Sequence, residues 1–143
     1  CSLRTRQLLA TILDIFSNIA KTTQPFSIKY EGVQNFGHKV LFLKVSANEH
    51  LTSLHERLVE AMLLIDPGSK LPTECTSDMI FHTTLSLDIS EDEYRQSQKY
   101  ILDLSNLHKE IVIDSIGIFL STDGRHWDIV GEKKLGSANR GLI

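Results

Sequence analysis

Three segments carry apolar residues at the spacing of an amphipathic helix. The first covers residues 5–21, where the apolar positions form the stripe of a helix that packs on a sheet. The second begins at Ser46-Ala-Asn-Glu49, which has the pattern of a capping box, and ends at Asp66-Pro-Gly-Ser69. The third begins at Ser90-Glu-Asp-Glu93, where the capping-box pattern is repeated. The pattern therefore predicts three helices, each with one buried face.

Shorter segments alternate between apolar and polar residues, or are continuously apolar, as β-strands do. The predicted strands are residues 26–30, 40–45, 80–87, 110–120 and 126–130. Gly32 and Gly37 mark the turn of a hairpin between the first two strands, and Asp123-Gly124 is a strong hairpin signal between the last two. The order of the elements predicts an α+β fold, with helices covering one face of a mostly antiparallel sheet.

The third predicted strand carries the most informative polar residues of the chain. Side chains of an extended segment alternate between two faces, so His82, Thr84 and Ser86 are predicted to share one face. The opposite face is predicted to be the core face, formed by Phe81, Thr83, Leu85 and Leu87. A histidine on a strand is more often structural than catalytic, whereas a hydroxyl two residues further on favours a site for an anion or a transferring proton.

Composition narrows the classes of protein that the chain can belong to. The chain has 143 residues, of which 41% are hydrophobic, and this is enough for the core of a single domain over residues 1–143. Fifteen basic and 18 acidic residues give a net charge of −3. This balance argues against a broad electrostatic surface for long nucleic acid or anionic membranes, but it leaves room for a local basic pocket.

Location and cofactors are predicted from patterns that are not found. Cys1 and Cys75 form no C-x-x-C pair, which favours a reduced intracellular compartment. No apolar run approaches the roughly 18 residues of a membrane span, and the N-terminal residues lack the layout of a signal peptide. Neither a Gly-rich phosphate loop nor a set of zinc ligands is present in the sequence. We therefore expect a cytoplasmic protein with no membrane partner, no cofactor and no metal.

Three segments, taken in order, carry a family resemblance. They are residues 25–33 with Phe36-Gly37 and residues 40–43, then Phe81-His-Thr-Thr-Leu85, and finally residues 116–120 with Asp123-Gly124 and Trp127. They look like a middle hairpin, an H-x-T-x motif and a closing hairpin. With this order and spacing, residues 26–135 resemble the 2H phosphoesterases, which include 2′,5′ RNA ligase-like proteins and phosphodiesterases that open 2′,3′-cyclic phosphates.

The resemblance implies a bilobal α+β fold of antiparallel sheets with helices packed on their outer faces. Each lobe of such a protein supplies one H-x-[T/S]-x motif, and the two motifs face each other across a cleft. Only the second motif is complete in this chain, because Cys1-Ser2-Leu3 looks like the last three residues of the first. The first histidine is expected directly before Cys1, and the opening strand and first helix of the family are expected upstream. A relative that has lost this histidine is the alternative.

The resemblance also implies roles for individual residues. His82 would be an acid or base, and Thr84 and Ser2 would donate hydrogen bonds to phosphate oxygens, which is catalysis without a metal. If residues 1–4 are extended, Arg4 shares a face with Ser2 and adds a charge-assisted contact, although an arginine near a chain start more commonly faces water.

Three further residues are candidates for contact with the substrate. Tyr30 and Phe36 are aromatic residues that could stack on a base, although alternating strands usually bury such rings. His38, beside the Phe36-Gly37 turn, is a candidate for lining the pocket.

Three functions remain open at this point. The first is a metal-independent phosphodiesterase or RNA end-processing enzyme that acts on a nucleotide or RNA terminus with a 2′,3′-cyclic or 2′,5′-linked phosphate. The second is a non-catalytic nucleotide- or RNA-binding module of the same fold. The third is a structural α+β domain in which His82 is a core residue.

Overall fold

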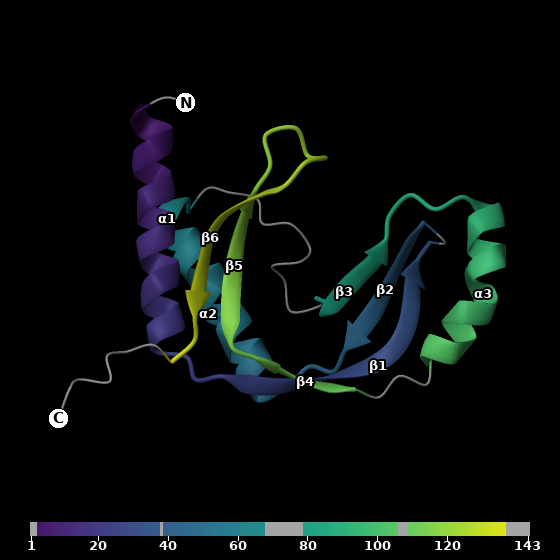
Figure 1. Ribbon diagram of the computed structural model, residues 1–143. Helices are drawn as coiled ribbons and strands as arrows, with labels where there is room; N and C mark the ends of the chain where they lie inside the picture. Colours follow the sequence, from purple (N-terminus) through teal and green to yellow (C-terminus); the bar gives the residue numbers. More distant parts are fainter. Residues whose placement is uncertain (1–2, 38, 68–78, 106–108, 137–143) are drawn as a thin grey trace. The chain divides into compact units, whose positions relative to one another are not determined.

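A computed structural model describes residues 3–37, 39–67, 79–105 and 109–136. Over these ranges the elements are α1 (Leu3–Lys21), β1 (Phe26–Phe36), β2 (Val40–Val45), α2 (Glu49–Ile65), β3 (His82–Ser86), α3 (Glu91–Ser105), β4 (Glu110–Ile113), β5 (Ser115–Leu120) and β6 (Asp128–Lys134) (Figure 1). The strands form a sheet of order β3-β2-β1-β4 and a separate pair, β5 and β6. The predicted α+β class is therefore confirmed.

The three predicted helices are all present, but only one of the two predicted capping boxes forms. At the start of α3, the main-chain N–H of Ser90 donates to Glu93 Oε2 (2.8 Å), and the N–H of Glu93 donates to Ser90 Oγ (3.3 Å). The Ser90 hydroxyl also donates to Glu93 Oε2 (2.7 Å), and this bond, followed by the one from the Ser90 N–H, lowers the pKa of Glu93. The Ser46 hydroxyl instead donates to Glu31, and α2 begins only at Glu49. The capping box predicted at Ser46 was wrong, because the main chain of Ser46 still bonds to the strand residue Lys29.

Of the predicted strands, only the one over residues 40–45 has the observed bounds; β3 (His82–Ser86) is shorter than predicted, and β6 (Asp128–Lys134) begins and ends later. β1 continues through Gly32 to Phe36, so Gly32 lies within the strand and not in the turn. The pairing register shifts between Tyr30 and Val33, and Gly32 has a φ of +92°, which residues with a Cβ rarely adopt. Glycine is thus needed for a bulge in β1, and the turn that follows is placed around Gly37, whose φ is +57°.

The segment predicted as one strand over residues 110–120 is split at Asp114. β4 joins the edge of the larger sheet beside β1, whereas β5 pairs with β6. The Asp114 carbonyl accepts a hydrogen bond from the N–H of Leu135 (2.8 Å), and its carboxylate pairs with Lys134 (2.8 Å). This ion pair lowers the pKa of Asp114 and raises that of Lys134. The break therefore rests on contacts with a distant segment and not on a local turn residue.

The chain forms two compact units. The first comprises Cys1–Phe26, His50–Lys70 and Val112–Ile143, and the second comprises Ser27–Glu49 and Leu71–Ile111. The first unit thus holds α1, α2 and the β5–β6 hairpin, while the second holds most of the larger sheet together with α3.

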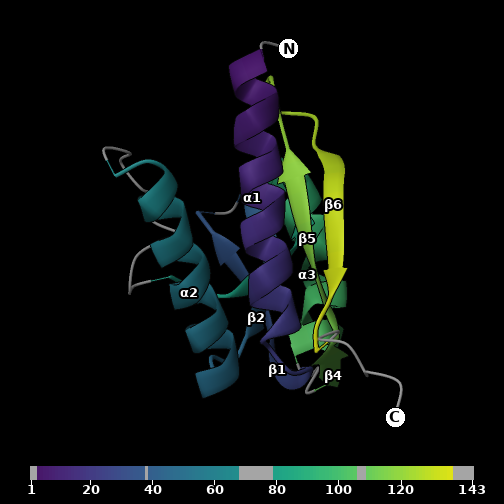
Figure 2. The same ribbon diagram turned by 90° about the vertical axis from the view of Figure 1, so that its left-hand side faces the viewer.

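In the first unit, α1 packs along β6 (Figure 2). Gly131 lies in this contact, since a Cβ at that position would come within 2.6 Å of Leu13 Cδ2. Arg57 of α2 donates a hydrogen bond to Thr23 Oγ1 (2.8 Å) just beyond the end of α1. The buried side chains of this unit are Ile19, Ala20, Phe26, Leu54 and Leu135. None of the described helices has an apolar stretch long enough to cross a membrane.

In the second unit, β2 pairs in antiparallel fashion with β1 on one side and with β3 on the other. β3 is consequently an edge strand of the sheet. The buried side chains of this unit are Ile28, Leu41, Phe42 and Val45, from β1 and β2. α3 is tied to β1 by a hydrogen bond from Asn35 Nδ2 to the Tyr94 hydroxyl (3.3 Å). The His82 motif therefore lies directly beside β2, which supplies three of these four buried side chains.

Candidate functional site

His82 is the first residue of β3 and is half-buried. Its Nδ1 lies 2.7 Å from the carbonyl oxygen of Ile80. Because a carbonyl oxygen can only accept a hydrogen bond, this contact assigns the hydrogen to Nδ1. The other ring nitrogen, Nε2, is then the one that can accept or release a proton toward a ligand.

Two phenyl rings support the imidazole. The Phe42 ring lies 5.1 Å from the His82 ring with an interplanar angle of 60°, and the Phe36 ring lies 5.4 Å away at 83°, so both contacts are edge-on. The two phenyl rings stack on each other at 4.1 Å. Phe42 is only 1% exposed, whereas Phe36 remains exposed at the surface. The structure thus brings the predicted residue Phe36 to His82 and anchors both on the core residue Phe42.

The pairing of β2 with β3 determines which polar side chains share the face of His82. Lys44 is the cross-strand partner of His82, and Phe42 is the partner of Thr84. Side chains of paired residues point to the same side of a sheet, so Thr84 and Lys44 flank the imidazole on one face. The Lys44 ammonium is bound to the Glu31 carboxylate at 2.8 Å, and Glu31 also accepts a hydrogen bond from Ser46.

Sequence reasoning missed Lys44. The alternation along β2 would have placed Phe42 and Lys44 on one face, but only the register between strands shows that this is the face of His82.

The predicted core face of β3 was wrong. Thr83, Leu85 and Leu87 are exposed, while His82 packs against the buried Phe42 ring. Among the strands that the structure describes, β3 pairs with β2 alone and so lies at the edge of the sheet, where side chains have fewer neighbours to bury them. The register also shifts between Leu41 and Phe42, and Ser86 pairs with Leu41. The strict alternation that would place Ser86 beside His82 and Thr84 is therefore not kept.

Tyr30 lies on the face opposite to His82. It pairs with Val45, the neighbour of Lys44, and its hydroxyl is 3.1 Å from the Thr83 hydroxyl. Tyr30 also lines a hollow of about 570 Å³, together with Lys29, Glu31, Ser46 and Glu110. Of the two aromatic residues predicted to contact a base, only Phe36 is brought to the imidazole.

Three predicted site residues remain to be placed, namely Ser2, Arg4 and His38. Ser2 and His38 lie outside the described residues, so their roles stay predictions. Arg4 belongs to α1, which begins at Leu3. The extended conformation that would have aligned Arg4 with Ser2 is therefore not found at residues 3 and 4. Within the described ranges, no three His, Cys, Asp or Glu side chains are grouped as ligands for a metal ion.

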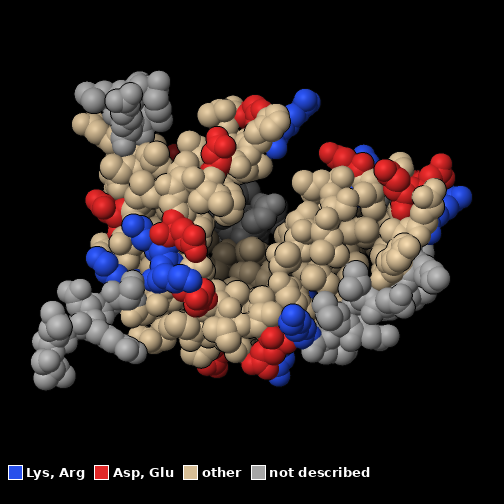
Figure 3. Space-filling model, in the orientation of Figure 1, with Lys and Arg blue, Asp and Glu red and all other residues tan. Residues whose placement is uncertain are grey.

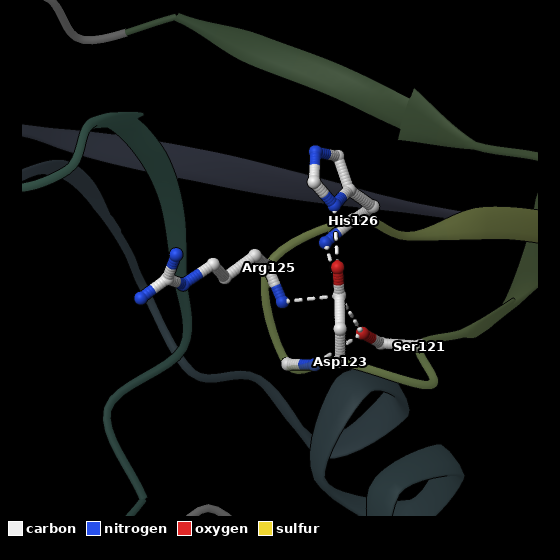
Figure 4. A network of polar contacts seen from close by, with 5 residues as sticks. Ser121, Asp123, Arg125 and His126 are labelled. Carbon is white, nitrogen blue, oxygen red and sulfur yellow. Dashed lines mark hydrogen bonds and ion pairs between the residues drawn. The ribbon is translucent and has the colours of Figure 1, made fainter.

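A second polar network occupies the loop between β5 and β6 (Figure 4). Asp123 Oδ1 accepts hydrogen bonds from the main-chain N–H groups of Arg125 and His126, both at 2.8 Å, and Oδ2 lies 2.5 Å from His126 Nδ1. The Ser121 hydroxyl accepts a bond from the N–H of Gly124 (2.8 Å). These donors, above all the N–H and the ring of His126, hold the pKa of Asp123 well below its usual range. The loop is thus ordered around one carboxylate.

Comparison with known families identifies the family of this chain. The sequence profile of the 2′-5′ RNA ligase superfamily matches residues 2–123. The chain belongs to the 2′-5′ RNA ligase superfamily. The predicted resemblance to the 2H phosphoesterases is thereby confirmed. No curated protein matches the chain.

The match to the 2′-5′ RNA ligase superfamily covers the His82 cluster but not the whole of the second network. His82 and Thr84 lie well inside the matched range, which ends at Asp123. Arg125, His126 and Trp127 lie beyond it. The matched range thus includes the motif on β3 and ends within the β5–β6 loop.

Proposed function

We propose that this member of the 2′-5′ RNA ligase superfamily is a metal-independent phosphodiesterase or RNA end-processing enzyme that acts on 2′,3′-cyclic or 2′,5′-linked phosphates. The observation that carries the proposal is the hydrogen bond of His82 Nδ1 to the Ile80 carbonyl. It leaves Nε2 available on a sheet face that also carries the exposed Thr84 hydroxyl. A structural histidine sealed in the core would have neither feature.

The reaction needs two proton transfers. In hydrolysis of a 2′,3′-cyclic phosphate, a water oxygen bonds to phosphorus and one of the two phosphorus–ribose oxygen bonds breaks. One group takes a proton from the water, and another gives a proton to the leaving ribose oxygen. Imidazole can do either at neutral pH, and His82 Nε2 supplies one of the two transfers. The resemblance to the 2H phosphoesterases assigns the other transfer to a second imidazole.

Charge that develops on the phosphate has to be stabilised as well. The Thr84 hydroxyl donates to a non-bridging oxygen, and Ser2 is proposed as the opposite donor. Lys44 adds a cation on the same face as His82. The Lys44 ammonium is bound to the Glu31 carboxylate. A phosphate that reaches Lys44 therefore exchanges this carboxylate contact for a phosphate contact. The Phe36 ring, which remains exposed beside the imidazole, offers an aromatic surface for a base.

The test is hydrolysis of 2′,3′-cyclic nucleotides by the full-length protein, with and without a chelator, beside the His82→Ala variant. Loss of one member of an acid and base pair should lower kcat by about 10²- to 10⁴-fold, and the chelator should have no effect. Unchanged turnover in the variant, or inhibition by the chelator, would contradict the proposed mechanism. Nucleotide binding without any turnover by the unaltered protein would instead favour the non-catalytic binding module.

A further inference from the structure

The β5–β6 hairpin exposes large apolar side chains near its loop. Phe119 is 55% exposed, Trp127 is 61% exposed and Ile129 is 68% exposed. Phe119 pairs with Ile129 across the two strands, so these two side chains share a face. Trp127 directly precedes β6 and comes two residues before Ile129, which is the spacing of side chains on one side where the chain is extended. We call these three residues the hairpin platform.

The opposite face of the hairpin is the one that packs in the first unit. Ile118 pairs with Gly131, and Gly131 lies against Leu13 of α1. The hairpin platform is therefore the face left uncovered by the helix. Gly117 lies under the Phe119 ring, since a Cβ there would come 3.3 Å from Phe119 Cε2. The absence of a side chain at Gly117 lets the ring lie over the strand, which makes the surface suited to stacking.

The loop that follows Phe119 and precedes Trp127 carries Arg125, a cationic residue whose main chain is held in place. The main-chain N–H of Arg125 is held by Asp123, and the guanidinium group points away from that network (Figure 4). Among the described residues, the Arg125 side chain has no hydrogen bond or ion pair. An ordered main chain reduces the conformational entropy that Arg125 loses when its side chain binds an anion.

The nearby carboxylates are poorly placed to pair with the Arg125 guanidinium. The Asp123 carboxylate already accepts hydrogen bonds from four donors of its own loop, namely the N–H groups of Arg125 and His126, the His126 ring and the Ser121 hydroxyl. Asp128 alternates with Trp127 and Ile129 and so faces the other side of the hairpin. Glu132 shares the face of the hairpin platform but pairs with Gly117, further from the loop than Phe119. Over the described residues, the end of the hairpin nearest the loop thus combines exposed aromatic rings with the Arg125 guanidinium, which has no carboxylate partner there.

We infer that the hairpin platform and Arg125 bind the single-stranded body of an RNA substrate, with bases stacked on Trp127 and Phe119 and a phosphate held by Arg125. This inference deepens the proposed function and rests on it for the choice of RNA. Aromatic stacking is tolerant of sequence and is worth a substantial part of single-strand binding. Arg125 comes two residues before Trp127 in the sequence, and a nucleotide chain, which alternates bases with phosphates, can engage the rings and the guanidinium group together.

The charge pattern predicts that this binding depends little on salt. On the face shown in Figure 3, acidic and basic side chains are interspersed, and no broad basic field is present. Only one or two phosphates should therefore be neutralised. For single strands this corresponds to a slope of roughly −0.7 to −1.4 in the logarithm of affinity against the logarithm of salt concentration.

The chain contains a single tryptophan, so its fluorescence reports on the hairpin platform alone. The probe is a single-stranded hexaribonucleotide with a plain 3′-hydroxyl end, which offers no cyclic phosphate for hydrolysis. We expect saturable quenching of Trp127 with the shallow salt slope given above. Failure of the proposed hydrolysis would leave this quenching intact, whereas hydrolysis of a cyclic mononucleotide without any quenching would overturn the inference alone.

Variants separate stacking from general apolar or electrostatic attraction, using anisotropy of a labelled hexaribonucleotide. Trp127→Leu should weaken binding by about 5- to 100-fold, while Trp127→Phe should restore most of it. Arg125→Ala should weaken binding and flatten the salt slope by about 0.7, and Arg125→Lys should recover part of both. Leu64→Ala on α2 is the matched control, because Leu64 is an exposed apolar residue of the same unit away from the hairpin.

Three results would overturn the inference. The first is equal affinity of Trp127→Leu and the unaltered protein for the hexaribonucleotide. The second is equally tight binding of inorganic polyphosphate, which carries charge but no bases. The third is a Trp127 emission that changes with protein concentration in the absence of RNA, which would make a second copy of the chain the occupant of the hairpin platform.

Discussion

Two histidines of this chain belong to hydrogen-bonded networks that are built in different ways. The ring of His82 is half-buried against Phe36 and Phe42, and its Nδ1 bonds to a main-chain carbonyl. The ring of His126 is exposed, and its Nδ1 bonds to the Asp123 carboxylate. The rings around His82 come from β1 and β2, far away in the sequence, whereas the partner of His126 lies three residues away.

The difference shows what each network can accomplish. Bonds that close within one loop order that loop and position whatever projects from it, as Asp123 positions Arg125. Bonds and contacts that join three strands can bring an imidazole, a hydroxyl and an ammonium group together on one sheet face. Such a group of side chains is not needed for any single segment to fold. Functional sites typically bring together groups of this kind. The His82 cluster is therefore the better candidate for chemistry, and the Asp123 loop for binding.

The largest expected effect is on stability, and it compares one phenyl ring from each region. Phe42→Ala should lower the free energy of unfolding by about 3–5 kcal/mol, because it removes a nearly fully buried ring and the support of His82. Phe119→Ala should cost far less, since that ring is 55% exposed. Urea denaturation of both variants measures the difference. Equal costs would mean that the Phe119 face is covered in solution and that the contrast between the two regions is false.

The second prediction tests the face assigned by strand register. Thr84→Val should reduce cyclic-phosphate hydrolysis by about 10²-fold, the typical cost of losing one donor to a developing oxyanion. Thr83→Val is the matched control, because Thr83 is adjacent and exposed but bonds to Tyr30 on the other face. It should change kcat by less than about threefold. Equal losses in both variants would place the phosphate elsewhere on β3.

Features that depend on local sequence could be predicted. The Ser90 capping box and the hairpin at Asp123-Gly124 are each closed by hydrogen bonds within a few residues, so the pattern of a short segment is enough to specify them. The His82 and Thr84 pair belongs to the same class, because alternation along β3 places these two residues on one side whatever the neighbouring strands do.

Features that depend on pairing between distant strands could not be predicted. Asp114 divides β4 from β5 because it bonds to Leu135 and Lys134, and nothing in its own neighbourhood marks a break. Lys44 joins the candidate site only through the register of β2 with β3. The prediction of which face of β3 is buried was wrong for the same reason. It depends on how β3 pairs with β2 at the edge of the described sheet, and the sequence of β3 alone does not specify that pairing.

The smallest expected effect concerns the Asp123 loop and its dependence on pH. Because the folded loop lowers the pKa of Asp123, the stabilisation is fully present above the ordinary pKa of an aspartate, about 4, and is lost as the pH falls toward the lower folded value. Acid titration of Trp127 emission should therefore show a loosening of the loop below about pH 4. Asp123→Asn should remove this component and loosen the loop at neutral pH as well.

The same substitution sharpens the contrast between the two histidines. Glu93 and Asp114 also have lowered pKa values and contribute to acid sensitivity, but they are unchanged in Asp123→Asn and cancel in the comparison. If Asp123 serves only to order its loop, hydrolysis of a cyclic mononucleotide should be unaffected while the affinity for the hexaribonucleotide falls severalfold. A matching loss of hydrolysis would show that the carboxylate of the local network serves the reaction of the His82 cluster, and the division between the two networks would then have to be abandoned.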